Sequence, residues 1–420
     1  MNIGIVIGRI GGVDGVALET EKWITVLRRM GHRVFVLTGQ LERPIADVER
    51  VTLLDLLAFD HPQAVEHQQL AFFGKPAREA ALLELLRRDA AAIERGILDW
   101  IAEHDITCLI AENASALPFH LTLGMALREV YASTNLLIVT HDHDFPWERG
   151  ERYATPFHGV RYILEECFPV RLPHVRHAVI NSPARATLRD RLGVQQVVVV
   201  PNVMDFDAPF GQPNAHNAHL RADLGLPADA RLLFQVTRIV ARKGIETAIH
   251  LVHRLQDPTV HLVITGTALD EPDQPYPHML RQLALELGVQ HRVHFASDQF
   301  TPSRYSLSDA YAHADACTYF STYEGFGNAF VEALVARRPV LVNNYEPVYW
   351  PDIGSLGFET VMIDSGVLTD ETIRQARRVL DEPEHRRRMV QRNFELGRLH
   401  FSYQALQRLL QRLLDPTVLG

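Results

Sequence analysis

Residues 2–37 read NIGIVIGRIGGVDGVALETEKWITVLRRMGHRVFVL, and this stretch decides the fold. Its opening run, Ile3-Gly4-Ile5-Val6-Ile7, is short, apolar and rich in β-branched residues, which is typical of a buried strand. Apolar residues then recur at helical spacing around Trp23 until Gly31 ends the pattern. A second apolar run, Arg33-Val34-Phe35-Val36-Leu37, follows directly. The stretch therefore predicts a βαβ unit, whose two strands lie parallel in one sheet.

The same alternation of short apolar runs with helical patterns continues to about residue 200. It predicts further strands at 107–111, 136–139, 178–180 and 197–200, with helices near 78–104, 117–131, 157–168 and 183–192. A stretch of turn-forming residues with weak periodicity follows Val203 and runs to Asn214. We interpret this stretch as an interdomain linker.

The alternation restarts in the second half of the chain. It predicts strands at 232–236, 260–264, 292–295, 316–320 and 340–342, and helices near 243–256, 277–287, 307–313, 328–336, 371–380, 384–398 and 401–414. We therefore predict two α/β domains, at 1–204 and 205–399, each with a mostly parallel sheet covered by helices on both faces. The closing helix, about 400–420, is a candidate to pack back on the first domain.

Length and composition narrow the class of protein. A chain of 420 residues exceeds one ordinary core, and 47% hydrophobic with 22% charged residues is globular composition. The net charge of −9 comes without a basic block, so we expect no nucleic-acid partner. The apolar runs are too short for a signal peptide or a membrane span, and the three cysteines lack metal-ligand or redox spacing. We expect a cytoplasmic protein without stable membrane association, and the sequence leaves a homo-oligomer open.

The most informative strand-to-helix junction is Tyr323-Glu324-Gly325-Phe326-Gly327-Asn328-Ala329-Phe330-Val331-Glu332. In open parallel sheets, ligands bind at such junctions, beyond the carboxyl ends of the strands. Gly325 and Gly327 let the backbone approach a ligand closely, beside the loop carboxylate of Glu324. Glu332 falls roughly one and a half turns into the helix and can reach a hydroxyl pair such as that of ribose. The alternative is a loop glutamate followed by an ordinary surface glutamate.

A second junction, Val236-Thr237-Arg238-Ile239-Val240-Ala241-Arg242-Lys243-Gly244, leads into the first helix of the second domain. Arg238 supplies a planar fork of donors and Lys243 a point charge. Together with the positive end of the helix dipole, they suit a diphosphate. We expect Arg242 to face solvent. The alternative is two exposed basic residues in a loop.

A third junction, Gly8-Arg9-Ile10-Gly11-Gly12-Val13-Asp14-Gly15, follows the first strand. Gly11 and Gly12 allow a close approach to phosphate or sugar, although the run matches neither a Walker loop nor a G-x-G-x-x-G motif. A tight turn is the alternative. Three arginines on this side of the protein, Arg9, Arg149 and Arg152, could bind the carboxylate or phosphate of a small acceptor such as a glycerate derivative or a sugar phosphate. They could also be ordinary surface arginines.

The fourth junction is Thr140-His141-Asp142-His143-Asp144-Phe145-Pro146-Trp147-Glu148-Arg149. His141, at a strand end, can hydrogen-bond a sugar hydroxyl, and Asp142 and Asp144 can orient it or bind an acceptor. An alternative makes His141 and His143 the metal ligands of a hydrolase. That alternative needs further ligands at later strand ends, and the sequence offers none. We therefore predict no metal site.

These four junctions, in this order on two successive α/β domains, resemble the retaining glycosyltransferases of the GT-B fold, in particular family 4, the group 1 glycosyl transferases. The segment from Glu324 to Glu332 matches the two-glutamate signature of that family, and Arg238 with Lys243 matches its diphosphate-binding pair. Pro201-Asn202-Val203 is similar to its Pro-Asn-Gly segment, with valine in place of glycine. The resemblance covers nearly the whole chain and implies two Rossmann-like domains facing each other across a deep cleft.

The resemblance also implies a role for each matching residue. The donor sugar is held by Glu324, Gly325, Phe326, Gly327 and Asn328, with Glu332 on the ribose. Arg238 and Lys243 neutralise the leaving diphosphate, and His141 lies at the reacting centre. Gly11 and Gly12 line the cleft near the phosphates and the acceptor. The implied catalytic residues are His141, Glu324, Arg238 and Lys243.

The implied activity is transfer of a hexose, glucose or mannose, from a nucleoside diphosphate sugar to a small hydroxylic acceptor, with retention at the anomeric carbon. UDP-glucose and GDP-mannose are candidate donors. No tightly bound cofactor is expected, with Mg²⁺ at most a stimulant. Two alternatives stay open, namely a metal-dependent hydrolase using His141 and His143, and a nucleotide-sugar-binding protein without catalysis. A phosphorylase would need a lysine motif for pyridoxal phosphate, which the sequence lacks.

Overall fold

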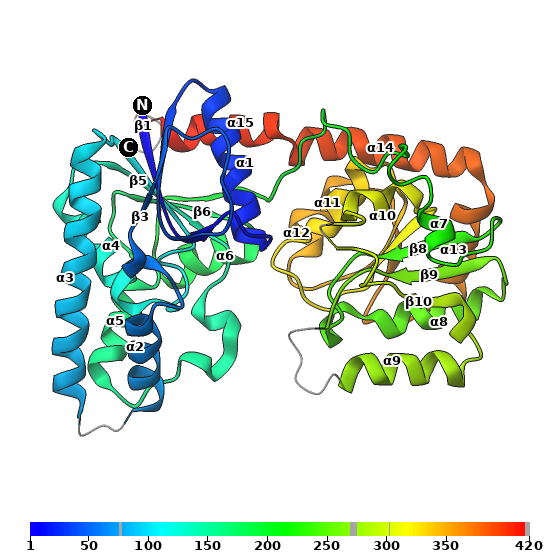
Figure 1. The fold of residues 1–420 in the computed structure, drawn as a ribbon, viewed down its shortest axis with the longest axis horizontal. Helices are drawn as coiled ribbons and strands as arrows, with labels where there is room; N and C mark the ends of the chain where they lie inside the picture. Colours follow the sequence, from blue (N-terminus) through cyan, green and yellow to red (C-terminus); the bar gives the residue numbers. More distant parts are fainter. Residues whose placement is uncertain (75–77, 269–274, 302, 416–420) are drawn as a thin grey trace. The chain divides into compact units, whose positions relative to one another are not determined.

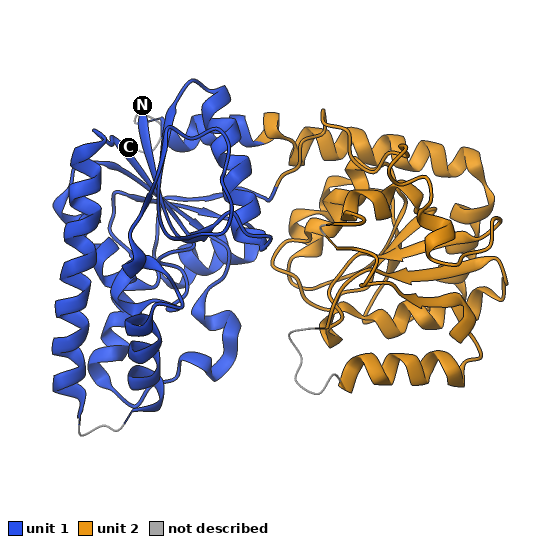
Figure 2. Ribbon diagram, viewed as in Figure 1, with its two compact units in different colours: residues 1–202, 406–420 blue, residues 203–405 orange. Residues whose placement is uncertain are grey.

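The computed structural model describes residues 1–74, 78–268, 275–301 and 303–415. The chain forms two compact units (Figure 2): unit 1 comprises residues 1–202 and 406–420, and unit 2 comprises residues 203–405. The boundaries predicted from the sequence were residues 204 and 399. None of the helices in the described part of the chain has the length and apolar character that crossing a membrane requires.

Unit 1 is built on a 7-stranded parallel sheet (Figure 1) in the order β3-β2-β1-β4-β5-β6-β7. Its strands are β1 (Asn2–Ile10), β2 (Arg33–Leu41), β3 (Arg50–Leu53), β4 (Cys108–Glu112), β5 (Leu137–Asp142), β6 (Val175–Val179) and β7 (Val197–Val199). Its helices are α1 (Gly15–Arg29), α2 (Pro62–Phe73), α3 (Glu79–Glu103), α4 (Leu121–Ser133), α5 (His158–Cys167) and α6 (Ser182–Ala186), and α15 (Tyr403–Leu414) returns to this unit. The strand order reverses between β1 and β4, and ligands bind at such a switch point in open α/β sheets.

Unit 1 is held together by a hydrophobic core and by hydrogen bonds to residues near the end of the chain. The core joins Leu109 and Ile138 of the sheet to Trp100 of α3 and Leu127 of α4. The buried guanidinium of Arg176 donates hydrogen bonds to the backbone carbonyls of Leu413 at 2.6 Å and Asp415 at 3.0 Å. Residues at the end of the chain are therefore part of the packing of unit 1.

Strand β5 is longer than the sequence predicted. The apolar run ends at Val139, but the strand continues to Asp142, so His141 lies within it. Every residue from Ile138 to Asp142 is buried between β4 and β6, and the N–H of Asn113 donates to the carbonyl of His141 at 2.8 Å. Backbone pairing on both sides thus extends the strand through polar residues, which an apolar pattern cannot reveal.

Unit 2 is built on a 6-stranded parallel sheet in the order β10-β9-β8-β11-β12-β13. Its strands are β8 (Arg231–Gln235), β9 (Val260–Ile264), β10 (Val293–Phe295), β11 (Ala316–Tyr319), β12 (Val340–Asn343) and β13 (Val361–Ile363). Its helices are α7 (Leu220–Asp223), α8 (Ile245–Leu255), α9 (Pro275–Glu286), α10 (Leu307–His313), α11 (Asn328–Val335), α12 (Tyr349–Asp352), α13 (Asp370–Asp381) and α14 (Pro383–Phe401). The order again reverses, here between β8 and β11.

The stretch interpreted as a linker belongs to unit 2. The N–H of Gly211 donates to the hydroxyl of Ser308 at 2.9 Å, and the ring of Phe210 lies 5.5 Å from that of Tyr311. Its irregular backbone is satisfied by side chains of α10 instead of by a helix or sheet. Turn-forming composition therefore indicated irregular structure correctly, and the stretch predicted as an interdomain linker lies in unit 2, directly after the boundary at residue 202.

The stability of unit 1 depends on pH through the buried side chain of His120. Its Nδ1 accepts a hydrogen bond from the N–H of Leu123, at the start of α4, and its Nε2–H donates to the carbonyl of Leu56 at 2.8 Å. Burial lowers the pKa of His120 to about 4. The imidazole of His120 therefore binds a proton more readily in the unfolded chain than in the folded one. The contribution of neutral His120 to the free energy of unfolding is complete above pH about 6.5. It is lost as pH falls toward 4, by up to about 3 kcal/mol.

The corresponding prediction compares the protein with the variant His120→Asn, which keeps a good helix cap but cannot titrate. Urea unfolding followed by tryptophan fluorescence reports on unit 1 through buried Trp23 and Trp100. Between pH 7 and pH 4.5, the wild type is expected to lose more stability than the variant. Equal losses in both proteins would contradict the role given to His120.

Candidate functional site

Two of the residues predicted to bind the donor meet at the carboxyl ends of β8 and β11 in unit 2. Lys243 Nζ donates a hydrogen bond to Glu324 Oε1, and Arg242 Nη1 lies 3.1 Å from Glu324 Oε2. Lys243 and Glu324 are both buried. Arg242 also donates to the carbonyl of Tyr323 at 2.9 Å, and its side chain stays 39% exposed, so it reaches Glu324 from a partly solvent-exposed position. A 3-10 turn over Ala241–Lys243 brings both basic side chains to the loop after β11.

Charge decides the protonation of Glu324. Burial alone acts to raise the pKa of this carboxyl, but Lys243 and Arg242 outweigh burial and hold the pKa below its usual value. Glu324 is therefore a carboxylate at neutral pH, with each oxygen next to a cation. The buried pair of Lys243 and Glu324 is costly to break, because removing one partner leaves an uncompensated charge.

The glycine-rich loop after Glu324 places the start of α11. Gly327 has φ 123°, a conformation that side-chain-bearing residues rarely adopt. The hydroxyl of Tyr345 donates to the carbonyl of Phe326 at 2.9 Å, and a Cβ at position 327 would lie 2.4 Å from that hydroxyl. Helix α11 then begins at Asn328, so its first backbone N–H groups lie at the end of the sheet.

Glu332 lies farther along α11, where it accepts a hydrogen bond from the hydroxyl of Tyr311 at 2.9 Å. This contact fixes the carboxylate predicted to hold the ribose. It leaves room for further hydrogen bonds, because an ionised carboxylate can accept about four.

The loop after β8 carries Arg238, whose side chain is exposed. It ends at Gly244, which has φ 60° and which passes so close to β11 that an added Cβ would lie 2.2 Å from the carbonyl oxygen of Phe320. Helix α8 begins at the next residue, Ile245, whose N–H donates to the hydroxyl of Tyr276 at 3.1 Å. Glycine is therefore required for Lys243 to reach Glu324.

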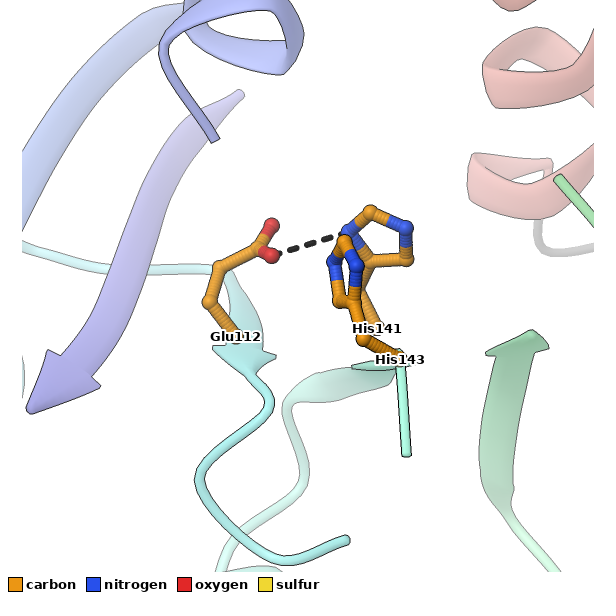
Figure 3. Close-up of side chains that lie close together, drawn as sticks. All are labelled: Glu112, His141 and His143. Atoms are coloured by element: carbon orange, nitrogen blue, oxygen red, sulfur yellow. Dashed lines mark hydrogen bonds and ion pairs between the residues drawn. The ribbon is translucent and has the colours of Figure 1, made fainter. Parts of the chain in front are cut away.

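In unit 1, the side chain of His141 is completely buried against acidic and aromatic neighbours (Figure 3). Its Nδ1 lies 2.8 Å from Oε2 of Glu112, the residue paired with it on β4. The ring stacks on Trp23 with centroids 4.0 Å apart, and the ring of His143 lies 4.4 Å away. Burial acts to lower the pKa of His141, but Glu112 and the nearby Glu19 outweigh burial and raise it.

Asp142, predicted to orient His141 or to bind the acceptor, is only 1% exposed. Its Oδ2 accepts a hydrogen bond from the hydroxyl of Thr140 at 2.6 Å and lies 3.3 Å from Nδ1 of His177. The carboxylate therefore binds partners inside the sheet, next to β6. Within the described part of the chain, it forms no hydrogen bond with the ring of His141.

The remaining predicted acceptor residues lie in ordinary local contacts. Asp144 and Arg149 form an ion pair at 3.0 Å, and Arg9 lies 3.3 Å from Asp14. The guanidinium of Arg152 lies 5.3 Å from the centre of the ring of Phe119. Near the start of α1, Gly11 has φ 80°, and a Cβ on Gly12 would lie 2.8 Å from the carboxylate of Glu42.

Glu112 was missed in the sequence because it closes an apolar strand, where a single glutamate gives no motif. Its position at the end of a predicted central strand is the available signal, since polar residues there often serve a ligand. The pairing of Glu112 with His141 depends on the strand order, which no local pattern reveals.

Comparison with known proteins identifies the family of this chain. A family model described as "Glycosyl transferases group 1" matches residues 217–395. A mannosylglucosylglycerate synthase of Thermotoga maritima is 30% identical, over 99% of this chain and 100% of its own length. The chain belongs to the group 1 glycosyltransferases. Another mannosylglucosylglycerate synthase, from Petrotoga mobilis, is 30% identical to this group 1 glycosyltransferase over 99% of the chain and 97% of its own length. Family membership favours sugar transfer over the hydrolase alternative.

Solved structures agree on the fold. The Anabaena protein Alr3699/HepE, determined with UDP and glucose, superimposes on this group 1 glycosyltransferase with a TM-score of 0.63 at 16% identity, covering 99% of each chain. At this identity the likeness concerns the fold alone. The predicted GT-B class, with two parallel α/β sheets of 7 and 6 strands, is confirmed.

Proposed function

We propose that this group 1 glycosyltransferase transfers a hexose, glucose or mannose, from a nucleoside diphosphate sugar to a small hydroxylic acceptor, with retention at the anomeric carbon. The observation that carries the donor half of the proposal is the cluster in unit 2 that joins buried Lys243 and Glu324 to the partly exposed Arg242. It offers two cations for a diphosphate beside a carboxylate for sugar hydroxyls. The exposed Arg238 adds a third cation in the same loop.

Each proposed donor contact matches one part of this unit. The diphosphate binds Arg238 and Lys243, and the sugar hydroxyls bind Glu324 and the backbone from Gly325 to Asn328. The ribose binds Glu332, which Tyr311 already holds in place. When the diphosphate leaves, these fixed cations stabilise its growing negative charge without reorganising, which is how preorganised sites lower barriers.

The state of Glu324 supports a binding role instead of a nucleophilic one. A retaining glycosidase places its nucleophilic carboxylate close to the acid that protonates the leaving group. Glu324 instead has a cation at each oxygen, which withdraws electron density from it. We infer that a phosphate oxygen of the leaving diphosphate takes the proton of the acceptor hydroxyl, while the protein contributes positioning and electrostatic stabilisation.

We assign acceptor binding to unit 1 and propose an acidic acceptor of the glycerate type. The names of the two relatives describe a product that contains mannose, glucose and glycerate. Arg9, Arg149 and Arg152 are candidates for a carboxylate. Arg9 and Arg149 pair with acidic side chains at the surface, and such exposed pairs contribute only about 0–1 kcal/mol, so an acidic acceptor can replace them.

A panel of UDP, GDP and ADP sugars tests the donor by thermal stabilisation of the full chain, with and without EDTA. A donor at 100 times its Kd stabilises the folded protein by about 2.7 kcal/mol. We expect one nucleotide to raise Tm selectively, whether or not EDTA is present. Arg238→Ala is expected to abolish the shift, whereas Arg374→Ala, which removes an exposed arginine paired with Glu371, keeps it. A panel without any shift contradicts the proposed donor site.

A further inference from the structure

Three buried side chains, Glu112, His141 and His143, lie close together in unit 1, with the carboxylate of Glu112 facing Nδ1 of His141 (Figure 3). One oxygen of Glu112 and one ring nitrogen each of His141 and His143 lie within 4.8 Å of one another. Within the described part of the chain, Glu112 Oε1, His141 Nε2 and His143 Nε2 have no hydrogen-bond partner. A buried polar atom left without a partner costs about 1–3 kcal/mol, so a bound group that contacts some of these atoms would stabilise the cluster.

The backbone fixes this arrangement. Glu112 and His141 are register partners on adjacent parallel strands, so their side chains leave the sheet side by side. His143 follows two residues later, and its N–H donates to the side-chain oxygen of Asn113 at 3.0 Å. The three side chains are therefore held by a central part of the sheet and by the turn after it, as a preorganised site requires.

The charge around the cluster favours a cation. Glu19 is buried beside His141 and its carboxylate acts on that ring in the same sense as the carboxylate of Glu112. Lys22 lies 2.8 Å from Glu19 and balances one of the two negative charges.

We propose that Glu112, His141 and His143 bind one divalent transition-metal ion in unit 1. Two imidazole nitrogens and one carboxylate oxygen suit Zn²⁺, and also Co²⁺ or Mn²⁺, better than Mg²⁺ or Ca²⁺. Ligand atoms around a tetrahedral zinc lie roughly 3.3 Å apart, so small side-chain rotations close the site.

The chemistry of the ligand set leaves at least one coordination position open. The sequence alone predicts no metal site. The third ligand, Glu112, precedes the two histidines on a neighbouring strand, whereas the hydrolase alternative requires further ligands at later strand ends. We propose this ion for a transferase, and its binding does not make the protein a hydrolase.

Cobalt binding to the full chain tests the site without any substrate. Protein treated with EDTA and freed of chelator is titrated with Co²⁺ while absorption between about 500 and 650 nm is followed, where four- and five-coordinate cobalt with nitrogen ligands absorbs. We expect saturation at one equivalent and displacement by Zn²⁺. Glu112→Gln and His143→Gln are expected to weaken binding by about 100-fold or more, the upper range for perturbing a metal site.

His67→Gln is the matched control, because His67 is also buried in unit 1 and bonded to a carboxylate, Asp89, at 3.0 Å, but is not part of the Glu112 cluster. This variant is expected to bind cobalt like the wild type. Circular dichroism checks folding of each variant; if the ligand variants do not fold, the wild-type titration decides. Absence of stoichiometric binding in folded wild type, or equal binding by folded ligand variants, overturns the proposal. The donor-induced thermal shift in EDTA tests the transferase separately.

Discussion

Lys243→Ala is expected to lower kcat/KM for the nucleotide sugar by about 1,000-fold, the upper effect of removing one preorganised donor from a developing negative charge. Lys243 is buried at the end of β8, and its ammonium contacts one oxygen of Glu324. The substitution removes a cation for the diphosphate and also leaves the partly exposed Arg242 as the cation that pairs with Glu324. Steady-state kinetics with saturating acceptor measure the effect.

The same variant should change the pH dependence of the reaction. Lys243 is the largest of the influences that lower the pKa of Glu324 against burial. Without it, the pKa of Glu324 rises, so the carboxylate is lost at a higher pH and the acid limb of kcat/KM moves upward. Arg254→Ala, which removes a basic residue from the last turn of α8, serves as the control and should leave both rate and profile unchanged. A Lys243→Ala enzyme with the wild-type acid limb would show that Glu324 is not needed as a carboxylate.

Gly244→Ala is expected to destabilise the protein by about 3 kcal/mol and to abolish the donor-induced thermal shift. A Cβ there would lie 2.2 Å from the carbonyl oxygen of Phe320, and φ is 60°. The left-handed conformation costs about 1–2 kcal/mol, and the forced separation of loop and strand adds about 1–3 kcal/mol. Because Gly244 follows Lys243 directly, the displaced loop also carries that lysine away from Glu324.

Gly288→Ala separates these two costs. Gly288 has φ 68° in the same unit, but an added Cβ meets nothing within 4 Å. This control should lose only the conformational part, about 1 kcal/mol, and should bind the donor normally. Urea unfolding monitored by circular dichroism gives both losses. Equal destabilisation by the two substitutions would mean that the contact with Phe320 does not constrain the loop.

The central strands of both sheets were predictable because each is buried on two faces and reads as an apolar run. The edge strand β3, with partly exposed residues, gives no such run and was missed, and the edge strand β13 was missed as well, although its 3 residues are apolar. Glu324 and Lys243 were found because they belong to local motifs.

Glu112 shows more clearly which site residues a sequence alone cannot predict. Its relation to His141 is created by the order of strands, in which β4 and β5 are neighbours. A single sequence encodes that order only through the whole fold. Sites assembled from one loop can thus be predicted from residues in a row, whereas sites assembled across strands require the topology first.

The bonds from Arg176 to the carbonyls of Leu413 and Asp415 have a consequence for biosynthesis. Domains fold as units while a chain emerges from the ribosome, starting from the N-terminus. Unit 2 is a continuous segment and has all its residues once position 405 has been translated, whereas unit 1 still awaits residues from 406 onward. The half of the protein that is translated first is therefore the half that is completed last, and Arg176 stays without these two carbonyl acceptors until translation has passed residue 415.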